Sequence, residues 1–195
     1  MLWRTIALRR LRLAVAAILV AAAALGCGSG GAGSSSEAAP DTSTVGQFEP
    51  PNVSAALGAL RARIGPDGRL LLLSVGQGVV DLTVLEAGAG APSGYAWTDG
   101  RLVPEPSSFT PGTGQTLAQA AFALSLVDPS VPADLAARAA GVAGSPDYHV
   151  TSMSISRTLV GPGRFALLWT VANTDDAAAP VLVARPDGSG YRRLA

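Results

Sequence analysis

The sequence has no lysine, one cysteine and one histidine among its 195 residues, and only 14% of the residues are charged. One cysteine excludes a disulfide within the chain. One cysteine and one histidine also exclude a zinc site of the usual composition, which takes four such ligands. The longest apolar run, residues 13–25, has 13 residues. A transmembrane helix needs roughly 20 residues, so this run is too short to span a membrane comfortably.

Charge is distributed unevenly along the chain. All 14 basic residues are arginines, and four of them precede the apolar run: Arg4, Arg9, Arg10 and Arg12. Residues 27–195 therefore hold ten arginines against 14 acidic residues, a net charge of −4. A nucleic-acid partner would require a basic patch that displaces phosphate counterions, so this balance argues against one. It also argues against electrostatic attachment to anionic lipid.

The first 27 residues have the order of an export signal. Residues 1–12 contain the four arginines and no acid, the apolar run follows, and a Gly/Ser-rich tract comes after it. A buried core helix or a single-pass anchor is the alternative, and the flanking arginines and glycines argue against both. The run ends Ala24-Leu25-Gly26-Cys27, which resembles the lipobox of bacterial lipoproteins. The resemblance implies that residues 1–26 are a signal peptide and that Cys27 is acylated.

An acylated Cys27 predicts where the protein resides. Two or three acyl chains hold a protein firmly on a bilayer without a membrane-spanning segment. Gly28 stands where inner-membrane lipoproteins of the family carry Asp, so the resemblance implies the outer membrane if the cell has one. Otherwise it implies the outer face of the cell membrane. Residues 27–51 are predicted to be a flexible tether that holds the domain about 25 Å from the lipid.

Residues 52–195 predict one α+β domain. Val53, Leu57, Leu60 and Ile64 recur at helical spacing, apolar runs follow, and Asp99-Gly100 marks a hairpin. The second half repeats this order from residue 130 to a final Asp187-Gly188 turn. We therefore expect an antiparallel sheet with helices on one face, arranged as two helix-plus-meander repeats over residues 52–106 and 130–195.

Between these halves, residues 116–127 have apolar residues on one helical face, which predicts a further helix. The order of helix and meander resembles the small PepSY-type modules of bacterial envelope proteins. That resemblance covers the order of elements and the Asp-Gly turns, and it assigns no functional residue.

Few residues have the pattern of a catalytic site. His149 has Ser152, Ser154 and Ser156 nearby, but serines at this spacing in a strand usually line one solvated face. Asp175-Asp176 is the best local candidate for a calcium site made of carboxylates alone, but it lies in a predicted hairpin loop, residues 173–179, where acids are usually solvated. A carboxylate-based hydrolase would require distant acids to converge, and the candidates are Glu86, Asp99 and Glu105. We expect no metal and no cofactor.

The aromatic residues predict an interaction surface. Tyr95 and Trp97 lie two residues apart in a predicted strand, and they would form a contact patch if their shared face were solvent-exposed. The sequence therefore favours a lipid-anchored, non-catalytic binding module whose partner is an envelope protein or polymer. The alternatives are a carrier of a small apolar ligand and an envelope hydrolase that uses carboxylates.

Overall fold

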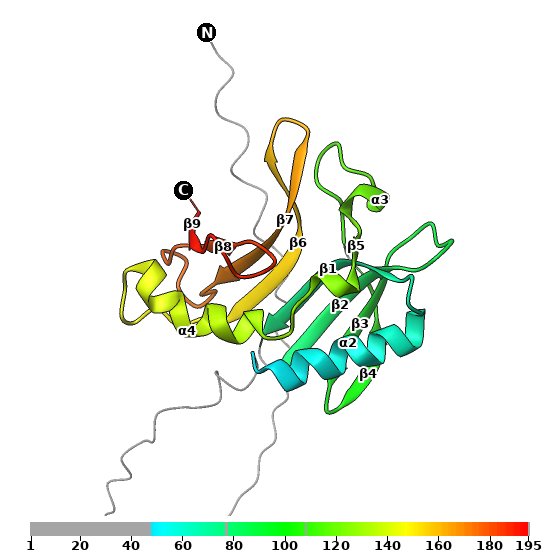
Figure 1. The fold of residues 1–195 in the computed structure, drawn as a ribbon, viewed down its shortest axis with the longest axis horizontal. Coiled ribbons are helices and arrows are strands. Elements are labelled where there is room, and N and C mark those ends of the chain that lie inside the picture. The colour runs from blue at the N-terminus through cyan, green and yellow to red at the C-terminus, as the bar shows by residue number, and fades with distance from the viewer. Residues whose placement is uncertain (1–47, 77, 108, 195) are drawn as a thin grey trace, which may run out of the picture. The chain divides into compact units, whose positions relative to one another are not determined.

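The computed structural model describes residues 48–76, 78–107 and 109–194 (Figure 1). The predicted signal peptide, Cys27 and most of the predicted tether lie outside the described residues. Within those residues, no helix is both long enough and apolar enough to cross a membrane.

The predicted α+β class is confirmed, since helices accompany one large antiparallel sheet. The first unit consists of α2 (Pro50–Ile64), β1 (Arg69–Gly76), β2 (Val79–Leu85), β3 (Ser93–Thr98) and β4 (Arg101–Glu105). A connecting segment holds α3 (Leu117–Ala120), β5 (Phe122–Ala123) and a 3-10 turn (Leu124–Leu126). The second unit consists of α4 (Val131–Ala143), β6 (Ser152–Gly161), β7 (Arg164–Ala172), β8 (Leu182–Ala184) and β9 (Arg192–Arg193).

The two units meet in the middle of the sheet. Its strand order is β4-β3-β2-β1-β6-β7-β8-β9, and β5 pairs with the start of β1. Ser74 of β1 faces Ser154 of β6, with Leu73 opposite Ile155 and Val75 opposite Met153. In strand order and register, an approximate twofold axis through the Ser74–Ser154 pair therefore relates the two helix-plus-meander units.

The main core lies against one face of this sheet. Two rows of buried side chains cross its central strands: Leu82, Leu73, Ile155 and Trp169, then Val80, Val75, Met153 and Val171. Buried residues of α2 and α4 belong to the same cluster, among them Leu60 and Leu135. Each such side chain contributes about 1.5–3 kcal/mol through its removal from water. The alternating apolar pattern of the strands thus gives one continuous core, to which both α2 and α4 contribute buried side chains.

The N-terminal boundary of the domain differs from the predicted one. Phe48 keeps only 2% of its surface exposed and belongs to the main core, and α2 begins at Pro50. The predicted limit at residues 51 and 52 therefore lies inside the helix. The proline pair at the helix start, which sequence reasoning assigned to the tether, suits the first helical positions because their N–H groups have no intrahelical partner.

The predicted helix over residues 116–127 is wrong in its extent. Thr116 and Gln119 form a capping box that starts α3, but the helix ends after one turn at Ala120. Phe122 and Ala123 instead pair with Leu70 and Arg69 of β1. The free edge of β1 beyond β6 thus overrides the helical spacing of this alanine-rich segment.

Candidate interaction site

Tyr95 and Trp97 share one face of β3, and that face lies against α2. Tyr95 is only 7% exposed, and Trp97 is partly buried against the main core. The indole Nε1 of Trp97 donates a hydrogen bond to Oδ1 of Asn52 on α2, at 3.2 Å. The two rings therefore bind the helix of their own unit and do not form the exposed aromatic patch that the sequence suggested.

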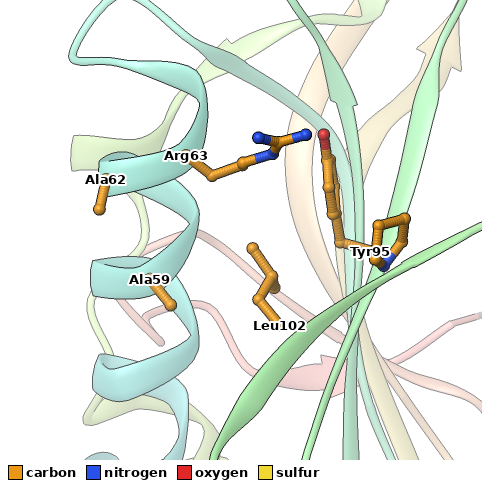
Figure 2. Close-up of a pocket in the computed structure, with 6 residues that line it drawn as sticks. Ala59, Ala62, Arg63, Tyr95 and Leu102 are labelled. Atoms are coloured by element: carbon orange, nitrogen blue, oxygen red, sulfur yellow. The ribbon is translucent and has the colours of Figure 1, made fainter.

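An open hollow lies beside these aromatics, between α2 and the edge strand β4. We name it the α2–β4 hollow, and its lining residues are Ala59, Ala62, Arg63, Tyr95, Leu102 and Pro104. Figure 2 shows Ala59 and Ala62 on the helix, with Ala59 on the side toward Leu102, and the ring of Tyr95 on the strand side. The short alanines leave room between helix and strand, so a side chain from another molecule has apolar walls to contact.

Polar groups gather at the Tyr95 end of the hollow. The Tyr95 hydroxyl donates a hydrogen bond to Oε1 of Glu86, at 2.8 Å. Figure 2 shows the Arg63 guanidinium reaching toward the same hydroxyl. Burial first, and then the hydrogen bond and charge of Glu86, raise the pKa of the Tyr95 phenol, and Arg63 opposes this shift. The phenol is therefore neutral at ordinary pH and keeps its proton for Glu86.

In the second unit, longer side chains fill the position that corresponds to the α2–β4 hollow. β9 lies beside β8 as β4 lies beside β3, and Arg193 faces Leu182 there. The Arg193 guanidinium donates to the Val142 carbonyl near the end of α4, at 3.3 Å. Tyr191, just before β9, has the Arg138 guanidinium 5.3 Å from its ring centroid. Leu102 and Pro104 are shorter than Tyr191 and Arg193, which explains why the first unit keeps a hollow.

The acids proposed for a hydrolase do not meet. Glu86 is bound to Tyr95, Asp99 lies in the β3–β4 turn, and Glu105 pairs with Gly94 at the opposite end of that hairpin. Burial, and then the nearby charge of Glu105, raise the pKa of Asp81. Sequence reasoning did not single out Asp81. The charge of Glu105 acts on it across β3, since Asp81 lies opposite Ala96 and Glu105 lies opposite Gly94.

His149 lies beside Asp175 at the surface. Their Nε2 and Oδ2 atoms are 3.6 Å apart, and both side chains are more than half exposed. Ser154 faces away from the main core, on the solvated side of β6 that its spacing predicted. Asp176 accepts a hydrogen bond from the Ala178 N–H within the loop. Among the described residues, no three His, Cys, Asp or Glu side chains come together as metal ligands.

Comparison with protein-family models, curated proteins and solved structures finds no match for this chain. No relative therefore assigns a role to the residues of the α2–β4 hollow, and their chemistry rests on their geometry. An open hollow of mixed apolar and polar lining, with one cation and one phenol at its end, leaves room beside the strand for contact with another chain.

Proposed function

We propose that this protein is a lipid-anchored, non-catalytic binding module of the cell envelope, and that its α2–β4 hollow takes an extended segment of an envelope protein. The single observation that supports the binding role is this open hollow next to β4, which has no partner strand on its outer side among the described residues. The lipobox-like ending at Cys27 supports the anchoring.

The hairpin turn determines what the free edge of β4 offers. Asp99 and Gly100 both have positive φ, 50° and 71°, as a two-residue turn of the I′ type requires. In such a hairpin the residues that flank the turn exchange hydrogen bonds, and the next pair points its backbone groups outward. The next pair here is Trp97–Leu102, so the N–H and C=O of Leu102 face the open edge.

An added strand is short for a physical reason. Pro104 faces the same edge two residues later and has no N–H to donate. The charged residues Arg101 and Glu105 also flank this edge, and charges limit indiscriminate strand pairing. A bound segment therefore pairs with the backbone around Leu102 and places one apolar side chain into the hollow.

The two alternative functions have less support from the structure. Large, fully buried side chains such as Trp169 and Ile155 occupy the space between sheet and helices that an apolar-ligand carrier would use. The hydrolase requires its carboxylates to converge, and Asp99 and Glu105 lie at opposite ends of one hairpin.

The test places a photo-crosslinking amino acid at Ala62, which lines the hollow, in the full-length protein in its own envelope. The matched control is Ala55, which is exposed elsewhere on the same helix. We expect one discrete protein adduct at Ala62 and none at Ala55. An additional Trp at position 59 (Ala59→Trp) should fill the hollow and reduce the adduct at least tenfold.

Equal adducts from positions 55 and 62 would contradict a specific site. An Ala62 adduct that Ala59→Trp leaves unchanged would show that the partner contacts the helix without entering the hollow. If the cross-linked partner survives protease but is degraded by polysaccharide-degrading enzymes, the partner is an envelope polymer and not a protein.

A further inference from the structure

Two strands of the sheet extend beyond their neighbours. β1 pairs with β6 only from Ser152 to Ser156, and β8 pairs with β7 only from Trp169 to Val171. Residues 157–168 therefore form a two-stranded ribbon whose outer edges have no partner strand among the described residues. Figure 1 shows this β6–β7 hairpin projecting at the top of the view.

The tip of this hairpin is apolar and basic. Leu159 and Val160 are consecutive and keep 48% and 50% of their surface exposed. Phe165 pairs directly with Leu159 across the ribbon, and Arg164 is exposed beside it. Residues 152–172 contain two arginines and no acid, although residues 27–195 have a net charge of −4.

The arrangement of these side chains suits lipid better than a protein surface. The register shifts between Leu159 and Gly161, so Val160 is an extra residue without a partner on β7. Leu159 and Val160 keep 48% and 50% of their surface exposed near the end of a ribbon whose two outer edges are free among the described residues. A bilayer interface surrounds a projecting tip, and the exposed Arg164 side chain can reach the phosphates there.

We propose that the tip of the β6–β7 hairpin inserts into the interface of a membrane that contains anionic lipids. The free ribbon edges limit the depth of insertion, because unpaired backbone groups need water or headgroups as partners. The overall negative charge does not prevent this contact, since charges farther than about 8 Å from the lipid are largely screened at physiological salt.

This inference does not depend on the α2–β4 hollow or on acylation of Cys27. If Cys27 is acylated, the tether keeps the domain close enough for the tip to contact the same membrane. The hairpin would then orient the domain, whereas the acyl chains retain it.

The experiment uses a chain that begins at Gly28, because the described residues bury a core of their own. Such a chain has no cysteine, so Pro162→Cys allows a single environment-sensitive dye at the tip. The probe membranes are phosphatidylcholine vesicles with and without an equal share of phosphatidylglycerol. Val103→Cys on β4, a site with an exposed valine, carries the control dye.

With anionic vesicles we expect the tip dye to shift to the blue and to be quenched by a lipid-borne quencher, while the Val103→Cys dye does not change. Leu159→Ser combined with Val160→Ser should weaken sedimentation with vesicles about tenfold, and Arg164→Gln should weaken it on anionic vesicles only. Val103→Ser is the matched control. Circular dichroism checks that each variant is folded.

Three outcomes would overturn the proposal. The tip dye could fail to respond to anionic vesicles, or the double serine variant could sediment as its parent does. The tip dye could also respond to an envelope protein and not to vesicles, which would make the hairpin a protein-binding ribbon. If vesicle binding persists in Ala59→Trp, the lipid-binding surface at the hairpin tip is distinct from the α2–β4 hollow.

Discussion

At the scale of single residues, Tyr95 connects three parts of the first unit. Its ring lines the α2–β4 hollow, its hydroxyl donates to Glu86 beyond β2, and Arg63 approaches it from α2. Sequence reasoning singled out Tyr95 and placed it correctly on one strand face with Trp97. Which face α2 covers depends on residues far away in sequence, so exposure could not be predicted from spacing alone.

Removal of the Tyr95 hydroxyl tests this connection. We expect Tyr95→Phe to lower the free energy of unfolding by about 1 kcal/mol at pH 7, because a hydrogen bond to a carboxylate is lost. The raised pKa of Tyr95 means that its contribution is complete below the ordinary tyrosine value of 10.0 and is lost as pH rises through the folded pKa. Urea unfolding at pH 7 and above pH 10 measures both effects.

The control is Glu86→Gln, in which the amide oxygen still accepts the hydrogen bond. The pKa of Tyr95 should fall in this variant because the raising charge is gone. An unchanged difference between wild type and Tyr95→Phe above pH 10 would contradict the assigned coupling.

At the scale of elements, local signals predicted turns well and long-range pairing poorly. The Asp-Gly pairs at residues 99–100 and 187–188 lie in turns, as predicted, since Gly100 and Gly188 both have positive φ. The alanine-rich segment after Thr116 became one helical turn and a short strand, because β1 offered it an unpaired edge. Its helical spacing contains no information about that edge.

Two glycine-to-alanine substitutions should change stability in opposite directions. Gly100 has a φ of 71°, so Gly100→Ala should destabilise the domain by about 1–2 kcal/mol. Gly58 lies in α2, and an added methyl group meets no atom within 4 Å. Gly58→Ala should therefore stabilise by about 0.5–1 kcal/mol, because alanine favours the helix. Chemical denaturation of the two variants side by side measures both, and equal signs would refute this account.

At the scale of the whole molecule, a folded domain with a projecting hairpin follows the segment that resembles a lipoprotein signal. If Cys27 is acylated and the β6–β7 tip inserts, the acyl chains and the hairpin would contact the same membrane. The α2–β4 hollow would remain available to an envelope partner. Under these proposals, retention at the membrane and partner binding would be separate properties, and each should be removable without loss of the other.

Cys27→Ser tests the anchor. We expect the variant to accumulate as an uncleaved or soluble precursor, because the residue that would be acylated is gone. Detergent-phase partitioning and the mobility of the protein on gels measure this. A cleaved Cys27→Ser protein that still enters the detergent phase would refute lipidation at this site, and Ser34→Ala in the predicted tether is the control.

Apolar periodicity and Asp-Gly turns allowed the sequence alone to predict an α+β domain, and the segment that ends at Cys27 predicts an export signal in front of it. These features are local, because each depends on residues within a few positions of one another. Only the tertiary structure shows that α2 covers Tyr95 and Trp97 and that Leu102 and Pro104 leave a hollow. It also shows that the β6–β7 hairpin extends beyond the neighbouring strands. Each of these depends on which distant strands and helices meet, and a linear pattern does not encode that pairing.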